Sequence, residues 1–207
     1  MHILFDFDGT LADSFNLVFT KTNLLAEKYN FRQIKEDEIE FLRDLSAKEL
    51  MSFLKVPMFK IPQLIQQLRK ELYSEIPAIS PVTNIHQILD TLYKAQFSLG
   101  ILTSNSIENV ELWLNTYNLR HFFNFIHIES NYLSKQYLIK RTLKKYRIDK
   151  SQVFYIGDEI RDIEAASKNQ IKSVAVTWGY NSERALLKYQ PTHIAQKPED
   201  ILSFCGL

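Results

Sequence analysis

Short apolar runs that end in polar turns alternate along this chain with longer segments of helical periodicity. Five runs predict buried strands, at residues 3–7, 97–102, 122–128, 153–156 and 173–177. The segments between them carry apolar residues at helical spacing, such as Ile85, Ile88, Leu89 and Leu92. Strands that alternate with helices form right-handed βαβ units, so we expect an α/β fold with a doubly wound, parallel, five-stranded sheet. Ligands of such sheets bind at the carboxyl ends of the strands.

The first two predicted strands are about 90 residues apart, whereas a crossover between parallel strands needs roughly a dozen residues. Residues 14–80 show helical periodicity throughout this gap, with apolar positions at Leu17, Val18, Leu24 and Leu25, and later at Leu64, Ile65, Leu68 and Leu72. Pro62 suits the first turn of a helix, and Pro77 and Pro81 would stiffen the return to the sheet. We therefore expect a core of residues 1–13 and 81–207 and an inserted helical cap of residues 14–80.

Composition narrows the class of partner. The 207 residues, 45% of them hydrophobic, suffice for one core and a small insertion. A net charge of +1 offers no attraction for nucleic acid or an anionic membrane, so we expect a small-molecule partner. Cys205 is the only cysteine, which excludes an internal disulfide and favours a reducing compartment. No signal peptide or membrane span is recognised, so we expect a cytoplasmic location. The oligomeric state stays open.

The five glycines form neither a dinucleotide-binding fingerprint nor a P-loop. Chemistry is instead suggested by the segment 5–11, FDFDGTL, at the end of the first predicted strand. Asp6 and Asp8 stand two residues apart, so on a strand they would project to one side, and Gly9 allows a turn after them. Two solvated aspartates at a surface strand end are the alternative, which the apolar neighbours disfavour. Buried like charges need a cation or a reacting group nearby.

Four segments, in order, resemble the motifs of the haloacid dehalogenase superfamily of phosphohydrolases. The first is DFDGTL at residues 6–11, and the second is ILTSN at residues 101–105. The third is Lys135, which we expect in a loop before a helix of residues 136–146, within LSKQ at residues 133–136. The fourth is YIGDEIRD at residues 155–162. The helical insertion is similar to that of phosphoglycolate phosphatase-like members, and the resemblance implies a Rossmann-like core.

The resemblance implies Mg²⁺-dependent hydrolysis of a small phosphate monoester, with 2-phosphoglycolate as a candidate, through an aspartyl-phosphate intermediate. By this resemblance Asp6 is the nucleophile, and Asp8 is the general acid and then the general base. The implied phosphate ligands are Thr103, Ser104, Asn105 and Lys135, of which Lys135 is also catalytic. The implied Mg²⁺ ligands are Asp6, the backbone carbonyl of Asp8, and Asp158, with Asp162 and Glu159 as further or indirect ligands.

Several of these residues have simpler interpretations. Asp162 could be a helix N-terminal acid favoured by the helix dipole, and residues 103–105 could merely cap the following helix. Glu159 stands where many relatives carry a small hydroxyl residue, and we expect it to point outward. Thr10 and Arg43 are candidates for substrate specificity; Arg43 would bind a substrate carboxylate or second phosphate, or else lie on a solvated helix face.

Three rival functions remain open on the sequence. A phosphosugar mutase similar to β-phosphoglucomutase would share the core and the cap. A dehalogenase fits less well, because that chemistry needs no metal and leaves Asp8 and Asp158 without a role. A non-catalytic binding module on the same fold would hydrolyse nothing.

Overall fold

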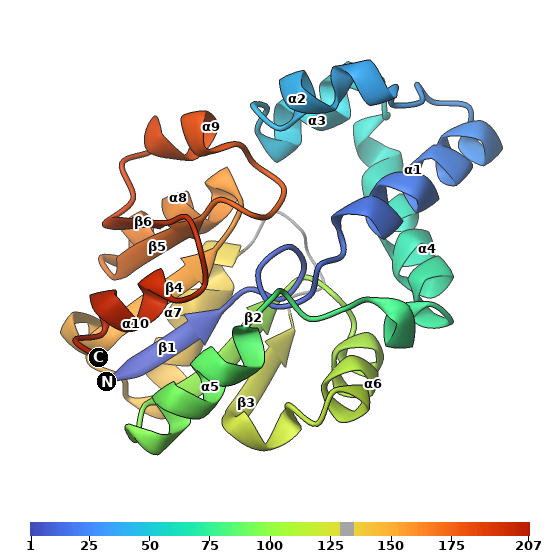
Figure 1. The fold of residues 1–207 in the computed structure, drawn as a ribbon. Coiled ribbons are helices and arrows are strands. Elements are labelled where there is room, and N and C mark those ends of the chain that lie inside the picture. Colours follow the sequence, from blue (N-terminus) through green and yellow to red (C-terminus); the bar gives the residue numbers. More distant parts are fainter. Residues whose placement is uncertain (129–134) are drawn as a thin grey trace.

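A computed structural model describes residues 1–128 and 135–207, and its described part contains one sheet of six parallel strands (Figure 1). The strands are β1 (His2–Phe5), β2 (Ser98–Thr103), β3 (Phe123–Ile128), β4 (Val153–Gly157), β5 (Lys172–Val176) and β6 (His193–Ala195). Their spatial order is β3-β2-β1-β4-β5-β6. The five predicted strands are confirmed. Strand β6 was missed because its three residues are too few to show the alternation of apolar and polar positions typical of a strand.

Helices cover both faces of the sheet, as the doubly wound prediction requires. Ile3 and Phe5 of β1 pack with apolar residues of α5 (Ile85–Lys94), α6 (Ile107–Thr116) and α10 (Asp200–Phe204). Leu4, which points to the opposite face, packs with α7 (Lys135–Tyr146) and α8 (Ile160–Asn169). The short α9 (Glu183–Leu187) packs Leu186 against α8 and β5. Alternate residues of the central strand therefore fill two separate cores.

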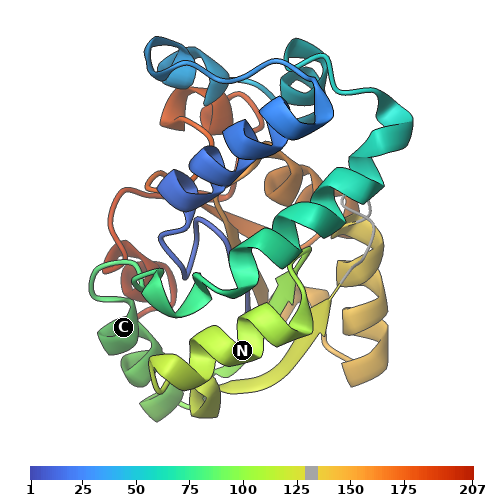
Figure 2. The same cartoon turned by 90° about the vertical axis from the view of Figure 1, so that its right-hand side faces the viewer.

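The long connection between β1 and β2 is helical and lies beyond the carboxyl ends of the strands (Figures 1 and 2). It contains α1 (Phe15–Tyr29), α2 (Ile39–Leu42), α3 (Ala47–Phe53) and α4 (Ile61–Tyr73). This connection also has single 3-10 turns at Glu36–Glu38, Met58–Lys60 and Ile76–Ala78; two more lie in the core, at Arg120–Phe122 and Lys150–Gln152. A proline stands in the first turn of α4, and Leu54, Val56 and Leu64 form a small apolar cluster within the insertion. We call residues 14–80 the cap; these exact boundaries stay a prediction.

The two linkers between core and cap run side by side. The Asp13 amide donates to the Ser80 carbonyl at 3.0 Å, and the Val82 amide donates to the Leu11 carbonyl at 2.9 Å. The chain therefore leaves the core and re-enters it at adjacent points.

Hydrogen bonds hold the cap against the core at two further places. On one side, Asn181 donates its side-chain amide to the carbonyl of Arg43 at 2.9 Å, and the Ser182 amide donates to the same oxygen at 2.9 Å. On the other, the Trp113 indole donates to the Ile79 carbonyl at 2.7 Å. The structure thus shows the cap docked over the open edge of the sheet.

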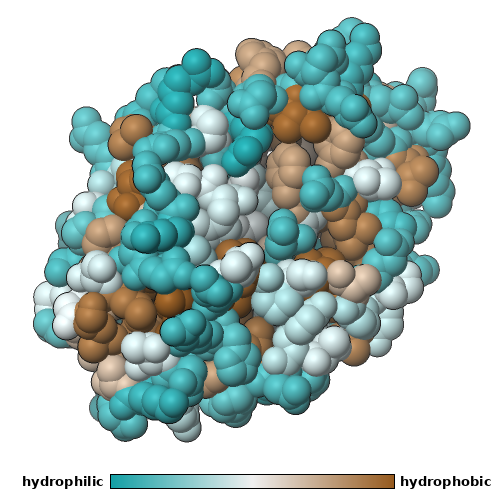
Figure 3. Space-filling model, viewed as in Figure 1, coloured by the Kyte–Doolittle hydropathy of each residue, from teal (hydrophilic) through white to brown (hydrophobic). Residues whose placement is uncertain are grey.

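The surface is mainly polar, with apolar residues in separate patches on the face shown in Figure 3. Phe59 and Met58, beside the start of α4, are exposed to 81% and 62%, and Tyr137 of α7 is also exposed to 62%. None of the described helices combines the length and the apolar character that crossing a bilayer requires.

Candidate active site

The loop after β1 aims two aspartates at different partners. Strand β1 ends at Phe5, so Asp6 and Asp8 follow the strand and the predicted alternation on one strand face does not apply. Gly9, at a φ of 72°, turns the chain directly after them. Asp6 is 2% exposed and accepts a hydrogen bond from the Phe7 amide at 2.8 Å. Both carboxylates therefore belong to the loop after β1 and not to a strand face.

Lys135 lies among the buried acids. It is the first residue of α7, so the prediction that it lies in the loop before the helix was wrong by one residue. Residues 133–134 of its motif lie outside the described residues. Its ammonium is 4% exposed, lies 2.5 Å from Asp6 Oδ2 and also contacts Asp162 Oδ1. Burial alone would lower the pKa of Lys135, but the carboxylates of Asp162 and Asp6 outweigh burial and raise it. Lys135 is therefore held as a cation.

Asp158 is fully buried and bonded on both oxygens. Its Oδ1 accepts from the Thr10 hydroxyl at 2.8 Å, and its Oδ2 accepts from the Tyr180 amide at 2.7 Å. Burial, followed by the charge of Glu159, raises the pKa of Asp158 well above its usual value. Thr10 is 1% exposed and faces Asp158, so its predicted role in substrate specificity is replaced by one in orienting this carboxylate.

Asp162 has two contacts at once. Its Oδ2 accepts from the Glu159 amide at 3.0 Å, which caps the start of α8, while its other oxygen meets Lys135. Burial raises the pKa of Asp162 to about 6, because the favourable charge of Lys135 offsets only part of the desolvation. Asp162 therefore caps α8 and also lies among the buried acids of the candidate site, while its role as a metal ligand stays a prediction.

Three buried carboxylates could hold a cation together. Oxygens of Asp6, Asp158 and Asp162 lie within 4.8 Å of one another, and Lys135 is the one basic side chain paired with them in the described part of the chain. Ionising all three carboxylates beside a single lysine is unfavourable, as the raised pKa values of Asp158 and Asp162 indicate, and a divalent cation would offset the excess negative charge. Hard carboxylate oxygens suit Mg²⁺. The donor set therefore fits the implied metal, with Asp162 belonging to the cluster and Glu159 outside it.

Two glycines make room for Asp158. A Cβ atom on Gly179 would overlap the Cβ and carboxyl atoms of Asp158, and one on Gly9 would overlap its Oδ2. Larger residues at either position would displace the carboxylate from the cluster. The glycines serve the proposed metal site and not a phosphate cradle.

Asp8 faces a different environment from Asp6. Its Oδ2 accepts from the side-chain amide of Asn105 at 2.9 Å, while its Oδ1 is buried without a hydrogen-bond partner among the described residues. Burial and then the charge of Asp6 raise the pKa of Asp8 to about 6. A carboxyl group with this pKa can give and take a proton near neutral pH.

The residues of the second motif lie beside Asp8. The Thr103 hydroxyl accepts from the backbone amide of Asn105 at 3.0 Å, so this amide is engaged within the protein, and the Asn105 side chain supports Asp8. The Ser104 hydroxyl lies 3.4 Å from a guanidinium nitrogen of Arg161. The structure brings these residues to the same edge as Asp6, Lys135 and Asp158; their contacts with phosphate stay a prediction.

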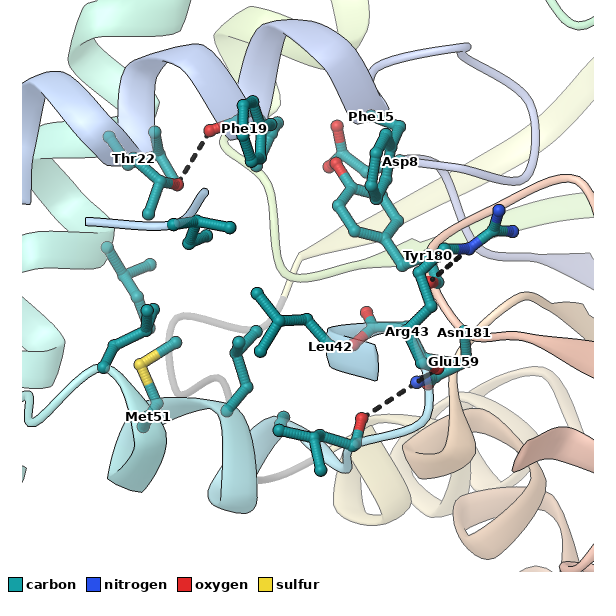
Figure 4. A pocket seen from close by; sticks show the side chains of 18 of the residues that line it. Asp8, Phe15, Phe19, Thr22, Leu42, Arg43, Met51, Glu159, Tyr180 and Asn181 are labelled. Carbon is teal, nitrogen blue, oxygen red and sulfur yellow. Dashed lines mark hydrogen bonds between the residues drawn. The ribbon is translucent and has the colours of Figure 1, made fainter. Parts of the chain in front are cut away.

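A cavity of about 220 Å³ separates this edge from the cap (Figure 4). Its core side is polar, and its cap side is mainly apolar, with Phe15, Phe19, Leu42 and Met51 among the lining residues. Glu159 borders the cavity, where it pairs with Arg161 at 2.9 Å, so the expectation of an outward glutamate was wrong.

Arg43 does not offer its charge to the cavity. Its guanidinium points away in Figure 4 and donates to the carbonyls of Gly179 at 2.9 Å, Thr177 at 3.3 Å and Tyr180 at 3.3 Å. These bonds fasten α2 to the loop after β5. Neither predicted role, substrate binding or a solvated helix face, matches this position.

Sequence reasoning missed two arginines that line the cavity. Arg161 lies within the fourth motif and was not singled out. Arg69 occupies an apolar position of α4: with Ile65, Leu68 and Leu72 it completes an i, i+3, i+4, i+7 stripe. A charged residue in such a stripe is the signal that could have found it.

Comparisons with known proteins agree with this arrangement. Residues 3–176 match the family model described as haloacid dehalogenase-like hydrolase. The chain is 32% identical over 200 residues to a phosphoglycolate phosphatase of Synechococcus elongatus, covering 97% of this chain and 94% of the relative. It is 24% identical over 211 residues to a pyrophosphatase PpaX of Bacillus velezensis, covering 99% and 96%.

Solved structures share the fold. A predicted phosphatase of Clostridium acetobutylicum superposes with a TM-score of 0.85 at 21% identity, covering 100% of this chain and 98% of that one. A haloacid dehalogenase-like hydrolase of Streptococcus pneumoniae gives a TM-score of 0.79 at 24% identity, covering 98% and 97%. The resemblance seen in four short motifs thus extends over nearly the whole chain, which belongs to the haloacid dehalogenase-like hydrolase family.

Proposed function

We propose that the protein is a Mg²⁺-dependent phosphatase that hydrolyses a small phosphate monoester through a phosphorylated Asp6. The observation that carries this proposal is the contrast between two neighbouring aspartates. Asp6 is fixed by a cationic lysine at 2.5 Å, whereas Asp8 has a raised pKa and one buried oxygen without a hydrogen-bond partner in the part of the chain that the structure describes. The similarity to a phosphoglycolate phosphatase makes 2-phosphoglycolate the first substrate to test.

Asp6 suits the role of nucleophile. The Phe7 amide and Lys135 hold its two oxygens, so the carboxylate is oriented before substrate arrives. Attack on phosphorus forms a bond to an Asp6 oxygen as the bond from phosphorus to the leaving oxygen breaks. Lys135 also provides positive charge for the phosphoryl oxygens.

Asp8 suits the proton transfers. In its protonated form it gives a proton to the leaving oxygen, and as a carboxylate it then takes one from the water that attacks phosphorus and releases Asp6. Asn105, which donates to Oδ2 at 2.9 Å, leaves Oδ1 as the oxygen for both transfers.

Asp6, Asp158 and Asp162, with the backbone carbonyl of Asp8, would hold Mg²⁺. When bound, the ion would offset repulsion between the anionic nucleophile and the anionic phosphate. Thr10 and the Tyr180 amide keep Asp158 oriented for this purpose. We propose that the cap excludes water from the cavity when docked and opens to exchange ligands.

The test is phosphate release from a panel of phosphate monoesters with Mg²⁺, run on the wild type, on Asp6→Asn and with a chelator. We expect release by the wild type alone, and trapping of a phosphoryl group on Asp6 after acid quench. Activity that survives Asp6→Asn or the chelator would contradict the mechanism. Isomerisation of a hexose phosphate without phosphate release would favour a mutase, and no turnover of any substrate would favour a binding module.

A further inference from the structure

A cap arginine, Arg69, borders the cavity. Arg69 lies on α4 in the stripe formed with Ile65, Leu68 and Leu72, all of which line the cavity. An apolar side chain would be expected there. Its Nε and Nη2 atoms are buried and have no hydrogen-bond partner among the described residues. Burying two guanidinium nitrogens without partners is unfavourable, so an arginine at this position needs a compensating contact.

The other arginines of the cavity differ from Arg69. Arg43 donates to three backbone carbonyls, and Arg161 pairs with Glu159 at 2.9 Å. Both are therefore engaged within the protein. Nε and Nη2 share one edge of the guanidinium plane, and two parallel N–H groups on one edge match the two oxygens of a carboxylate or of a phosphate.

Hydrogen bonds fix Arg69 on the leaving-group side of the site. Its carbonyl accepts from the side-chain amide of Asn109 at 3.1 Å, and the same amide donates to Asn105 Oδ1 at 2.9 Å. Asn105 in turn donates to Asp8. Burial lowers the pKa of Arg69, and the charge of Asp8 opposes this effect.

Two groups without hydrogen-bond partners among the described residues thus border one cavity: Oδ1 of Asp8 and the Nε–Nη2 edge of Arg69. Asp8 would meet the leaving oxygen of the substrate, so Arg69 would meet what lies beyond that oxygen. Apolar walls around the cavity strengthen an ion pair formed there. We propose that Arg69 binds an anionic group on the leaving group, in the first place a carboxylate, and thereby selects substrates that carry a second negative charge.

This inference rests on the proposed function, and a pair of substrates separates the two. 2-Phosphoglycolate and 2-hydroxyethyl phosphate are similar in size, but only the first has a charged leaving group. We expect the wild type to prefer 2-phosphoglycolate by about 100-fold in kcat/KM, and Arg69→Gln to abolish most of this preference by losing far more activity on 2-phosphoglycolate than on 2-hydroxyethyl phosphate. Arg69→Lys should retain part of the preference. Pyrophosphate, added as a third substrate, shows whether a phosphate serves in place of the carboxylate.

Lys70→Gln is the matched control, because it removes the same charge from the neighbouring exposed position of α4. It should leave the preference unchanged, and melting temperatures check that all variants fold. Equal turnover of the two esters by the wild type, or an equal loss on both in Arg69→Gln, would overturn the inference and leave the proposed function intact.

A binding measurement covers the case without turnover. Calorimetry on Asp6→Asn, with and without Arg69→Gln, compares the affinities for the two esters directly. Selective, Arg69-dependent binding of 2-phosphoglycolate by a wild type that hydrolyses nothing would support the inference and refute the phosphatase. Absence of both binding and hydrolysis would refute both.

Discussion

Replacing Thr10 by valine tests the proposed metal site through a residue that does not belong to it. Valine has nearly the shape of threonine but lacks the hydroxyl that donates to Asp158 Oδ1 at 2.8 Å. Thr10 and Asp158 are both buried, at 1% and 0% exposure, so water does not replace the lost donor. The backbone amide of Tyr180 is then the remaining hydrogen-bond donor to the Asp158 carboxylate among the described residues.

The expected loss of Mg²⁺ affinity follows from the strength of this hydrogen bond. A hydrogen bond to a charged group contributes about 1.5–3 kcal/mol. At about 1.4 kcal/mol for each factor of ten, its loss corresponds to a weakening of Mg²⁺ binding by roughly 10- to 100-fold. This range agrees with the usual effect of removing a group that orients a metal ligand.

The assay is phosphate release at increasing Mg²⁺ concentration, with direct calorimetry of Mg²⁺ binding. Thr10→Val should need about 10 to 100 times more Mg²⁺ for half-maximal activity and should keep its order of preference among substrates. Thr10→Ser, which retains the hydroxyl, is the control and should stay close to the wild type. An unchanged Mg²⁺ requirement in Thr10→Val, or an equal defect in both variants, would refute the reasoning.

Three further predictions concern other parts of the site. Gly179→Ala should abolish activity, because the added Cβ overlaps Asp158, whereas Gly206→Ala, with nothing within 4 Å, should keep it; an active Gly179→Ala would contradict this. Lys135→Gln leaves buried carboxylates without their cation and should lower the free energy of unfolding by about 3–5 kcal/mol in denaturant titrations. Mg²⁺ should restore part of that loss, and equal stability with and without the ion would argue against a shared cluster. Asn109→Ala removes one buried and one part-buried hydrogen bond and should lower the free energy of unfolding by about 2 kcal/mol in the same assay, with a lower kcat because Asn105 loses its support; Asn115→Ala, at an exposed position of the same helix, should change neither.

The order and type of the main elements could be predicted from the sequence because the core strands are buried on both faces. Such strands appear as unbroken apolar runs, and the helices between them keep a clear period. Strand β6 has only three residues, of which His193 and Ile194 are half-buried, so no run marks it. The first motif was recognised from residue order alone, but Asp6 and Asp8 have different partners and both follow the end of β1, where the strand rule does not apply.

The less accurate predictions concern residues whose partners are distant in sequence. Thr10 contacts Asp158, 148 residues away, and Arg43 contacts carbonyls 134–137 residues away. A specificity role suited both as long as only their neighbours along the chain were known. Arg69 was overlooked for a different reason. The helix that carries it was predicted correctly from its apolar residues, and the one charged residue within that apolar stripe was not considered.

The paired linkers also bear on how this architecture tolerates change. The chain leaves the core and returns to it at residues that are hydrogen-bonded to each other, Asp13 to Ser80 and Leu11 to Val82. The insertion is therefore a loop whose two ends are fixed side by side on the core. The entropy of closing a loop depends only weakly on its length, and the paired ends keep a change in that length from reaching β1. Helices between these linkers can therefore be lengthened, shortened or exchanged while the aspartates of the first motif keep their positions, so that new substrates can be acquired without rebuilding the catalytic edge.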